Sequence, residues 1–224
     1  MNTGDTAFMM ICAALVFFMT PGLAFIYGGL VRRKNVCNTI MACVAIMGLS
    51  VVMWTLFGYS LSFGGNHAGI IGDFRWFGLN GVGMEAGPYA DSIPHLVFCA
   101  FQMMFAMITP ALITGSLVGR MKFKALFLFV AIWSVIVYYP MTHMVWGDGG
   151  FLAAIGSVDF AGGDVVHISS GISALVLAII LGRRRGYEHT TYRIHNIPSV
   201  VLGASLLWFG WFGFNAGSAL KGRK

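Results

Sequence analysis

The chain has 224 residues, of which 58% are hydrophobic and only 10% are Asp, Glu, Lys or Arg, and its mean hydropathy is +0.79. This composition excludes an ordinary water-soluble domain and predicts an all-α polytopic protein of the lipid bilayer. The formal net charge of +6 does not indicate a nucleic-acid partner, because the basic residues are not gathered on a face or tail and fall in short loops between apolar runs.

A membrane-spanning helix needs about twenty mostly apolar residues, and six stretches of the sequence have that character. The first is not expected to be a secretory signal, because it carries Asp5, has no basic residue before its apolar part and is not followed by an A-x-A site. We therefore expect residues 1–224 to form a single transmembrane domain. The six expected spans are residues 7–30, 37–63, 95–119, 124–145, 163–181 and 197–219.

Charge alternates between the loops. Ten of the 14 basic residues follow the first, third and fifth spans, so the positive-inside rule places these loops in the cytoplasm and the N-terminus outside. Seven of the eight acidic residues fall on the outer side, and Glu188 is the exception. The ten basic residues are Arg32, Arg33, Lys34, Arg120, Lys122, Lys124, Arg183, Arg184, Arg185 and Arg193.

The last four residues, 221–224, break this alternation. The sixth span should emerge outside, yet Lys221, Arg223 and Lys224 follow it. A cloning or frame-shift end, a stop inside a longer gene, or a tail on a span that fails to translocate would each explain them. We favour a truncation.

No pattern in the sequence predicts an enzyme or a cofactor. The four cysteines lie in or at the edges of spans, where they serve as small apolar residues rather than as ligands or disulfides. No set of His, Cys and Asp has metal-ligand spacing, and G-x-S-x-G, H-E-x-x-H and phosphate-loop motifs are absent. The cysteines are Cys12, Cys37, Cys43 and Cys99.

A histidine lies inside the fifth span. His167 is about sixteen residues, or roughly 24 Å at helical rise, from the basic loop that begins at Arg183. An imidazole is costly in hydrocarbon, so its presence at that depth indicates a role in binding or relaying a proton. A histidine satisfied by packing is the structural alternative.

Four segments of the sequence share a pattern with one known family. They are MTPGLAFIYGGLVRRKN (19–35), HMVWGDGG (143–150), DFAGGDVVHISSG (159–171) and GWFGFNAGSA (210–219). Together they resemble the ammonium transporter family, the Amt branch of the Amt/Rh superfamily. The resemblance implies an eleven-helix fold of two inverted five-helix repeats plus a last helix, assembled as a trimer. This chain would hold the first repeat and one further helix, without the partner histidine of the second repeat.

The resemblance also assigns a site at the outer mouth. Trp146 would recruit a cation by its ring quadrupole, worth about 0.5 to 2 kcal/mol, and Ser218 would accept a hydrogen bond. Phe105 and Phe214 would stack below as a dry gate, with Phe105 also contacting the substrate. A tryptophan of the interfacial belt and phenylalanines of the core are the alternatives.

Below the gate the resemblance places His167 in a hydrogen-bonded pair of imidazoles that lines the pore. Asp159 would support the site without direct contact, either by accepting backbone N–H groups at a helix start or by favouring a cation. Asp164 stands where a small residue or threonine is expected. It is either a neutral variant or a group that raises the cation affinity of the vestibule or shifts the proton affinity of His167.

The resemblance thus implies ammonium or ammonia transport by a multi-pass protein of the inner membrane. Its expected partners are the substrate, the bilayer, two further copies in a homotrimer and a PII-type signalling protein on the cytosolic face. An ammonium sensor that binds without conducting, or a non-functional fragment, is the alternative. A second pore histidine in five further spans would favour transport, and a downstream kinase or cyclase domain would favour sensing.

Overall fold

The computed structural model describes residues 1–184, 187–188 and 192–219. The tail 221–224 and Arg185, which carry part of the charge argument, lie outside the described residues. Six helical spans are long and apolar enough to cross a membrane, so the all-α polytopic class is confirmed. They are Thr3–Leu30, Arg33–Phe63, His95–Leu117, Phe123–Ala154, Gly163–Leu181 and Ile197–Ser218.

The spans match the expected ranges closely, and the main difference is that the fourth continues to Ala154. Three spans are single α-helices, and three contain a π-helical turn. The single helices are α1 (Thr3–Leu30), α4 (His95–Leu117) and α9 (Ile197–Ser218). The others are α2 (Val36–Met53), turn η2 (Trp54–Gly58) and α3 (Tyr59–Phe63); α5 (Phe123–Trp133), turn η4 (Ser134–Tyr138) and α6 (Tyr139–Trp146); and turn η5 (Gly163–Ile168) with α8 (Ser169–Leu181).

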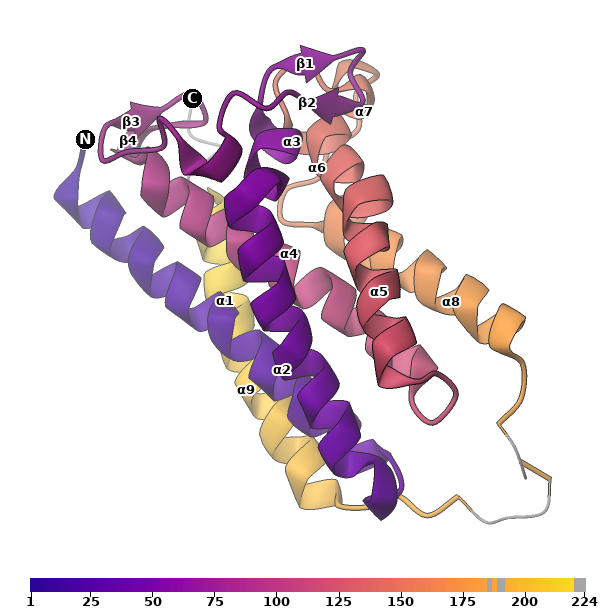
Figure 1. The fold of residues 1–224 in the computed structure, drawn as a ribbon. Coiled ribbons are helices and arrows are strands. Elements are labelled where there is room, and N and C mark those ends of the chain that lie inside the picture. Colours follow the sequence, from indigo (N-terminus) through magenta and orange to yellow (C-terminus); the bar gives the residue numbers. More distant parts are fainter. Residues whose placement is uncertain (185–186, 189–191, 220–224) are drawn as a thin grey trace.

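Short elements connect the spans. Two antiparallel hairpins, which the sequence analysis did not predict, lie at one end of the bundle (Figure 1). Strands of two to five residues are too short to show an alternating pattern in the sequence. The hairpins are β1 (Asn66–His67) with β2 (Ile71–Gly72), and β3 (Ala86–Gly87) with β4 (Ala90–Pro94); the short helices are η1 (Arg33–Asn35), η3 (Phe77–Leu79) and α7 (Phe151–Ala154).

We call the end of the bundle that carries the strands the hairpin end. The opposite end holds the loops after α1, α4 and α8, and we call it the basic end (Figure 1). The described basic residues that the charge argument assigned to one side all lie in or beside these three loops. The alternation of charge therefore corresponds to the two ends of the folded bundle.

The first and last helices, α1 and α9, pack side by side along their length, although they are far apart in the sequence (Figure 1). Glycines allow this approach. A Cβ added to Gly203 would lie 2.5 Å from the carbonyl oxygen of Gly22, and one added to Gly213 would lie 2.8 Å from the carbonyl oxygen of Cys12. Small residues at helix contacts let backbones approach, which is the usual basis of helix packing in membranes.

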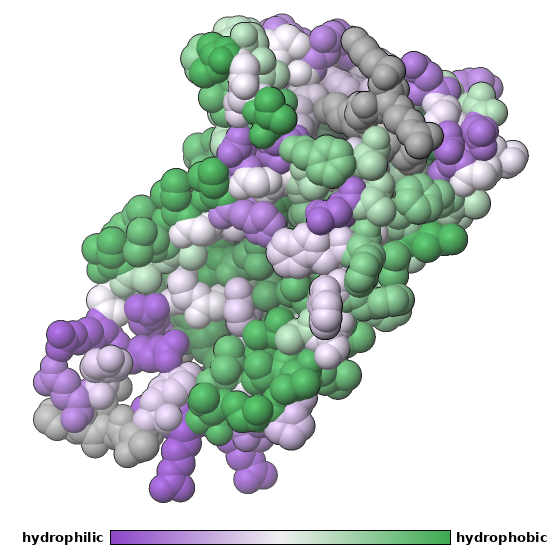
Figure 2. All heavy atoms as spheres, turned by 180° about the vertical axis from the view of Figure 1, so that it is seen from behind, coloured by the Kyte–Doolittle hydropathy of each residue, from purple (hydrophilic) through white to green (hydrophobic). Residues whose placement is uncertain are grey.

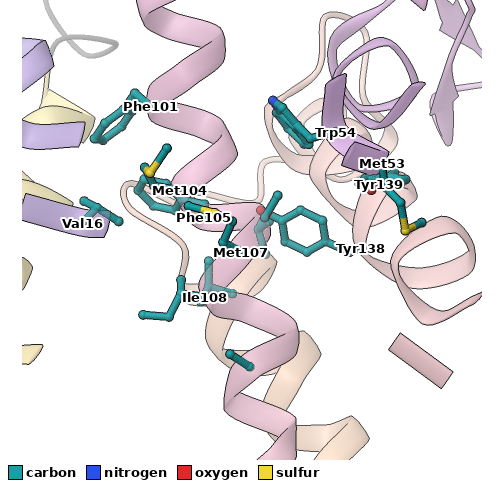
Figure 3. Close-up of a cluster of buried hydrophobic side chains, with 14 of the residues drawn as sticks. Val16, Met53, Trp54, Phe101, Met104, Phe105, Met107, Ile108, Tyr138 and Tyr139 are labelled. Atoms are coloured by element: carbon teal, nitrogen blue, oxygen red, sulfur yellow. The ribbon is translucent and has the colours of Figure 1, made fainter. Parts of the chain in front are cut away.

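Helix α4 runs through the middle of the bundle and is the most buried span. Its side chains pack toward α1 on one side and toward the π-turn spans on the other (Figure 3). The spans that contain the π turns η2 and η4 pack together, and Gly58 in η2 leaves room there for the ring of Tyr139. The residues labelled in Figure 3 are Val16, Met53, Trp54, Phe101, Met104, Phe105, Met107, Ile108, Tyr138 and Tyr139.

One carboxylate organises the loop that follows α3. Asp73 accepts hydrogen bonds from the backbone N–H of Gly65 (2.9 Å) and of Arg75 (3.0 Å), and its side chain pairs with the Arg75 guanidinium at 3.1 Å. Burial of Asp73 opposes its ionisation, but these donors outweigh that effect and hold the pKa of the carboxyl below its ordinary value. The loop is therefore stabilised by the charged form of Asp73.

We predict that the loop loosens in acid. Because the pKa of Asp73 is lower in the folded state, its stabilising contribution is present above the ordinary pKa and is lost as pH falls through the folded value, below about pH 4. Hydrogen exchange at the amides of Gly65 and Arg75 should accelerate in that range, beyond the intrinsic effect of pH. Asp73→Asn should exchange faster at neutral pH and lose the acid transition; an acid transition that persists in the variant would assign it to another group.

We also predict that Gly203→Ala lowers the thermal midpoint of the detergent-purified protein. The added methyl group meets the backbone of α1, which cannot move aside as a side chain can, and overpacking of this kind costs about 1 to 3 kcal/mol. Gly48→Ala on α2 is the matched control, since its added Cβ has no neighbour within 4 Å. Equal thermal midpoints for the two variants would show that the contact between α1 and α9 accommodates the added methyl group without loss of stability.

Candidate functional site

Five rings from four spans form a continuous series that runs from the buried Phe105 and Phe214 to the exposed His167. Adjacent ring centroids are 5.8 Å apart for Trp146 and Phe105, 4.3 Å for Phe105 and Phe214, 6.1 Å for Phe214 and His167, and 5.3 Å for His167 and Trp211. We call this series the aromatic column. The structure therefore brings together the tryptophan, both phenylalanines and the histidine that the sequence analysis singled out, and it adds Trp211.

Trp146 is the last residue of α6, and its indole is fixed in orientation. The ring N–H donates to the backbone carbonyl of Asp159 at 2.9 Å. The ring meets Phe105 edge to face, with an interplanar angle of 86°. Because the polar edge of the indole is satisfied, its face is the part of Trp146 available to a ligand.

A small cavity of about 30 Å³ lies beside Trp146 at the hairpin end. A space of roughly 10 to 15 Å³ is enough for one water molecule, so the cavity accommodates a ligand of that size. Its walls are mostly aromatic and aliphatic, with a few polar groups. The lining residues are Met9, Tyr89, Ala90, Ile93, Phe98, Phe101, Gln102, Trp146, Phe160, Gly217 and Ser218.

The polar groups of the cavity include oxygen atoms that can accept hydrogen bonds from a ligand. The Ser218 hydroxyl donates to the carbonyl of Phe214 at 2.9 Å, which leaves its lone pairs for a ligand. Gln102 is 7% exposed and supplies an amide. The Tyr89 hydroxyl donates to the carbonyl of Phe63 at 2.8 Å, and burial raises its pKa, so it stays neutral. A cavity with an indole face and oxygen acceptors suits a small cation with N–H donors.

Phe105 and Phe214 close the column below the cavity. Each is 1% exposed, and their rings are tilted by 31°. Phe105 comes from α4 and Phe214 from α9, so the contact joins the centre of the bundle to the last helix. Glycine makes this possible, because a Cβ at Gly217 would lie 2.5 Å from the ring of Phe101.

His167 lies on the π turn η5 and faces away from the packed interior. Its backbone N–H donates to the carbonyl of Gly162, five residues earlier, at 3.0 Å. The imidazole is exposed in this chain and stacks on Trp211 with an interplanar angle of 13°. Below it, Ser169 and Ser170 donate their hydroxyls to the carbonyls of Val165 and Val166, which helps satisfy the backbone around the π turn.

Asp159 holds the start of this span. Its Oδ1 accepts the N–H groups of Gly162 (2.5 Å) and Gly163 (2.8 Å), and its Oδ2 accepts those of Asp164 (2.8 Å) and Val165 (3.0 Å). A helix start leaves four backbone donors without partners. One carboxylate supplies partners for all four of these donors, and its backbone carbonyl also orients Trp146.

Asp164, whose role the sequence analysis left open, has a local partner. Its Oδ2 accepts a hydrogen bond from the hydroxyl of Ser157 at 2.9 Å. The bond ties the loop after α7 to the first turn of the span that carries His167. The hydrogen bond from Ser157 therefore gives Asp164 a structural role at this position.

Phe101 and Gln102 are site residues that the sequence analysis missed. Phe101 precedes Phe105 by four residues in the segment FQMMF, a spacing that places both on one face of a helix. Its ring centroid lies 5.0 Å from that of Phe105. Within the described part of the chain no group of His, Cys, Asp or Glu could hold a metal ion, and all four cysteines are free thiols.

The fold and the site together define the class of protein. It is a multi-pass α-helical membrane protein in which an aromatic column leads from a small, acceptor-lined cavity. The model of the Ammonium Transporter Family matches residues 7–224. The chain belongs to the ammonium transporter family.

Relatives and solved structures agree. The ammonium transporter of Bacillus subtilis is 51% identical over 220 residues, which is 98% of this chain and 54% of that protein. Saccharomyces cerevisiae Mep2 superposes with a TM-score of 0.89 at 36% identity, over 98% of this chain and 51% of that chain. A sensor Amt protein gives a TM-score of 0.86 at 31% identity, over 96% of this chain and 55% of that chain. The chain thus spans about half the length of the relatives it matches.

We predict that Asp159→Ala loosens the start of the fifth span. Four backbone donors would lose a charged acceptor, and hydrogen bonds to charged groups contribute about 1.5 to 3 kcal/mol. Hydrogen exchange at the amides of residues 162–165 should accelerate by at least about tenfold. Asp148→Asn removes one negative charge from the same end and is the control; equal exchange in both variants would contradict the capping role.

Proposed function

We propose that this chain forms part of an ammonium transporter and that the aromatic column is its conduction path. The observation that carries the proposal is the ordered series of an acceptor-lined cavity, a closed phenylalanine pair and a histidine. The similarity to proteins named ammonium transporters supports the choice of substrate. Residues 1–224 act as one transmembrane domain in this proposal.

In the first step the cation leaves water for the cavity beside Trp146. The indole face attracts it, and the Ser218 oxygen and the Gln102 amide oxygen accept its N–H groups. Hydrated sodium or potassium would have to lose its water shell in a space of about 30 Å³ with few oxygen atoms. The site therefore favours ammonium over these ions.

In the second step the substrate passes the pair Phe105 and Phe214. Two buried rings with centroids 4.3 Å apart leave no open passage, so the rings must separate for each transfer. A bare charge between apolar carbons is costly, whereas ammonia is not. The gate thus favours loss of a proton before or during passage.

His167 is the proton-handling group of the proposal. A neutral imidazole has one donor and one acceptor nitrogen, so it can accept a hydrogen bond from ammonia or take the proton released from ammonium. Its exposed face, together with the exposed apolar side chains of Ile172 and Leu175 on α8, would be covered by a second repeat. That cover would turn the open half of the column into a pore.

We further propose the arrangement in the cell that the charges and the resemblance imply. The N-terminus lies outside, the basic end faces the cytoplasm, and the membrane is the inner membrane. A homotrimer, and a PII-type protein that docks on the basic end, are the partners that the family resemblance supports.

Ammonium sensing is the second candidate function. The superposition on a sensor Amt protein supports it, since its TM-score of 0.86 is close to the 0.89 obtained with Mep2. A sensor would use the cavity at Trp146 and Ser218 and would not need flux through Phe105 and Phe214. Flux and binding measured on one preparation distinguish the two functions.

We predict that Trp146→Leu and His167→Ala each reduce methylammonium uptake by about tenfold or more in cells that lack their own ammonium carriers. The first removes the cation-attracting face and the second removes the proton acceptor. Trp208→Leu and His67→Ala are matched controls, because Trp208 is 72% exposed on α9 and His67 lies in the β1 hairpin.

All variants are compared at equal membrane abundance. Uptake by the parent chain that neither site variant reduces would exclude the column as the path. Sensing would be favoured if the parent chain shows no uptake but binds ammonium, and Trp146→Leu loses that binding.

A further inference from the structure

A second, larger hollow lies at the basic end, away from the aromatic column. Its volume is about 580 Å³, within the range of roughly 300 to 1,000 Å³ typical of small-molecule sites. It lies where the loops after α1, α4 and α8 meet, together with the segment before α9. Its lining residues are Arg32, Lys34, Asn35, Gly119, Arg120, Lys122, Leu181, Arg183, Arg184 and Tyr192.

The charge of this basic pocket is strongly one-sided. Six of its ten lining residues are Lys or Arg, and none carries a carboxylate. The carboxylate of Glu188 pairs with Arg183, but Glu188 does not line the pocket. Charges of one sign that line a concave wall reinforce one another and attract an ion of opposite sign.

Two of the cations share one aromatic ring. The guanidinium carbon of Arg32 lies 5.2 Å from the ring centroid of Tyr192, and that of Arg184 lies 4.8 Å from it. The two guanidinium carbons are therefore no more than about 10 Å apart, which is about one Debye length at roughly 0.1 M salt. At that distance their repulsion is only partly screened, and an anion close to both would relieve it.

A third arginine forms the wall of the pocket. Arg120 donates to the carbonyl of Gly182 at 2.8 Å and to the carbonyl of Ser116. It thereby fastens the end of α4 to the end of α8, and a cation there also complements the negative end of each helix dipole. The pocket thus has a fixed side, at Arg120, and a side with long basic chains from two other loops.

A general preference for positive charge on one side of a membrane does not account for this geometry. Arg33 and Arg193 lie in the same two loops as Arg32 and Arg184, yet neither lines the hollow. Hydrophilic residues gather around the loop that follows α8, at the lower left of Figure 2. Convergence of selected side chains from three loops is the feature that distinguishes a site from a charged surface.

We propose that the basic pocket binds a phosphate-bearing anion. A phosphate group presents several acceptor oxygens and more than one negative charge, and planar guanidinium groups bind it through paired N–H donors. Asn35 and the Tyr192 hydroxyl add neutral donors. The inference is independent of ammonium conduction, because the pocket shares no residue with the aromatic column.

The phosphate can come from two sources, a phospholipid headgroup or a soluble phosphate compound. An adjoining hollow of about 490 Å³ shares Arg120, Arg183 and Arg184 and continues to Ala178 and Ile179 on the apolar surface of α8. In this 224-residue chain a headgroup in the basic pocket would have a route for its acyl chain along this surface, which the second repeat of the proposed function would cover in the whole transporter. A soluble anion would need the basic pocket alone.

The test uses the whole 224-residue chain purified in a nonionic detergent. One arm titrates inorganic pyrophosphate by calorimetry, and the other counts bound phosphatidylglycerol against phosphatidylcholine by native mass spectrometry. The double variant Arg32→Gln with Arg184→Gln should weaken binding about tenfold or more. The control Arg33→Gln with Arg193→Gln removes the same charge from the same loops and should retain binding within about twofold.

Binding of pyrophosphate identifies a soluble source, and selective binding of phosphatidylglycerol without it identifies a lipid headgroup. Arg32→Lys with Arg184→Lys keeps both charges but loses the planar donors, so it should bind more weakly than the parent and more tightly than the Gln variant. Equal loss of binding in the Gln variant and its control would show that net charge alone explains the binding, which would overturn the proposal. Absence of binding in both arms would overturn it as well.

Discussion

The aromatic column depends on one set of hydrogen bonds, those that Asp159 accepts. A helix that begins inside a membrane protein exposes four backbone N–H groups, and each is expensive to leave unpaired away from water. The Asp159 carboxylate accepts all four from residues 162–165, while its own carbonyl accepts the indole N–H of Trp146. The first ring of the column and the span that carries its histidine are therefore positioned by the same residue.

Glycine supplies the other half of the arrangement. Phe214 and Ser218 belong to α9, which packs directly on α1 and meets α4 where Phe214 contacts Phe105 and Gly217 approaches Phe101. Bare backbone at Gly203, Gly213 and Gly217 makes that approach possible. The hydrophobic effect is weak between helices in lipid, so close packing of this kind largely determines where the last helix lies. The side chains that α9 contributes to the candidate site are thus positioned by glycines, which have no side chain.

Much of the fold could be predicted from the sequence, because membrane spans are set by length and apolar character. All six appear within a few residues of their expected ranges, except that the fourth is longer. The hairpins could not be predicted, since two-residue strands such as Asn66–His67 have no pattern to detect. For the site, motifs identified Trp146 and His167, but Gln102 and Trp211 became visible only when separate helices were brought together.

The three π turns have a consequence for how substitutions on these spans are interpreted. A π turn holds one residue more than an α turn, so every residue that follows it is displaced by about 100° around the helix axis relative to an unbroken α-helix. A helical wheel drawn through 163–181 with a constant period would therefore assign the wrong faces to either His167 or Ile179. Shortening η5 by one residue would preserve a hydrophobic helix of spanning length and still turn the imidazole out of line with Phe214. Such a variant would keep the length and hydropathy of a membrane span, although the helix face that carries His167 would have been rotated.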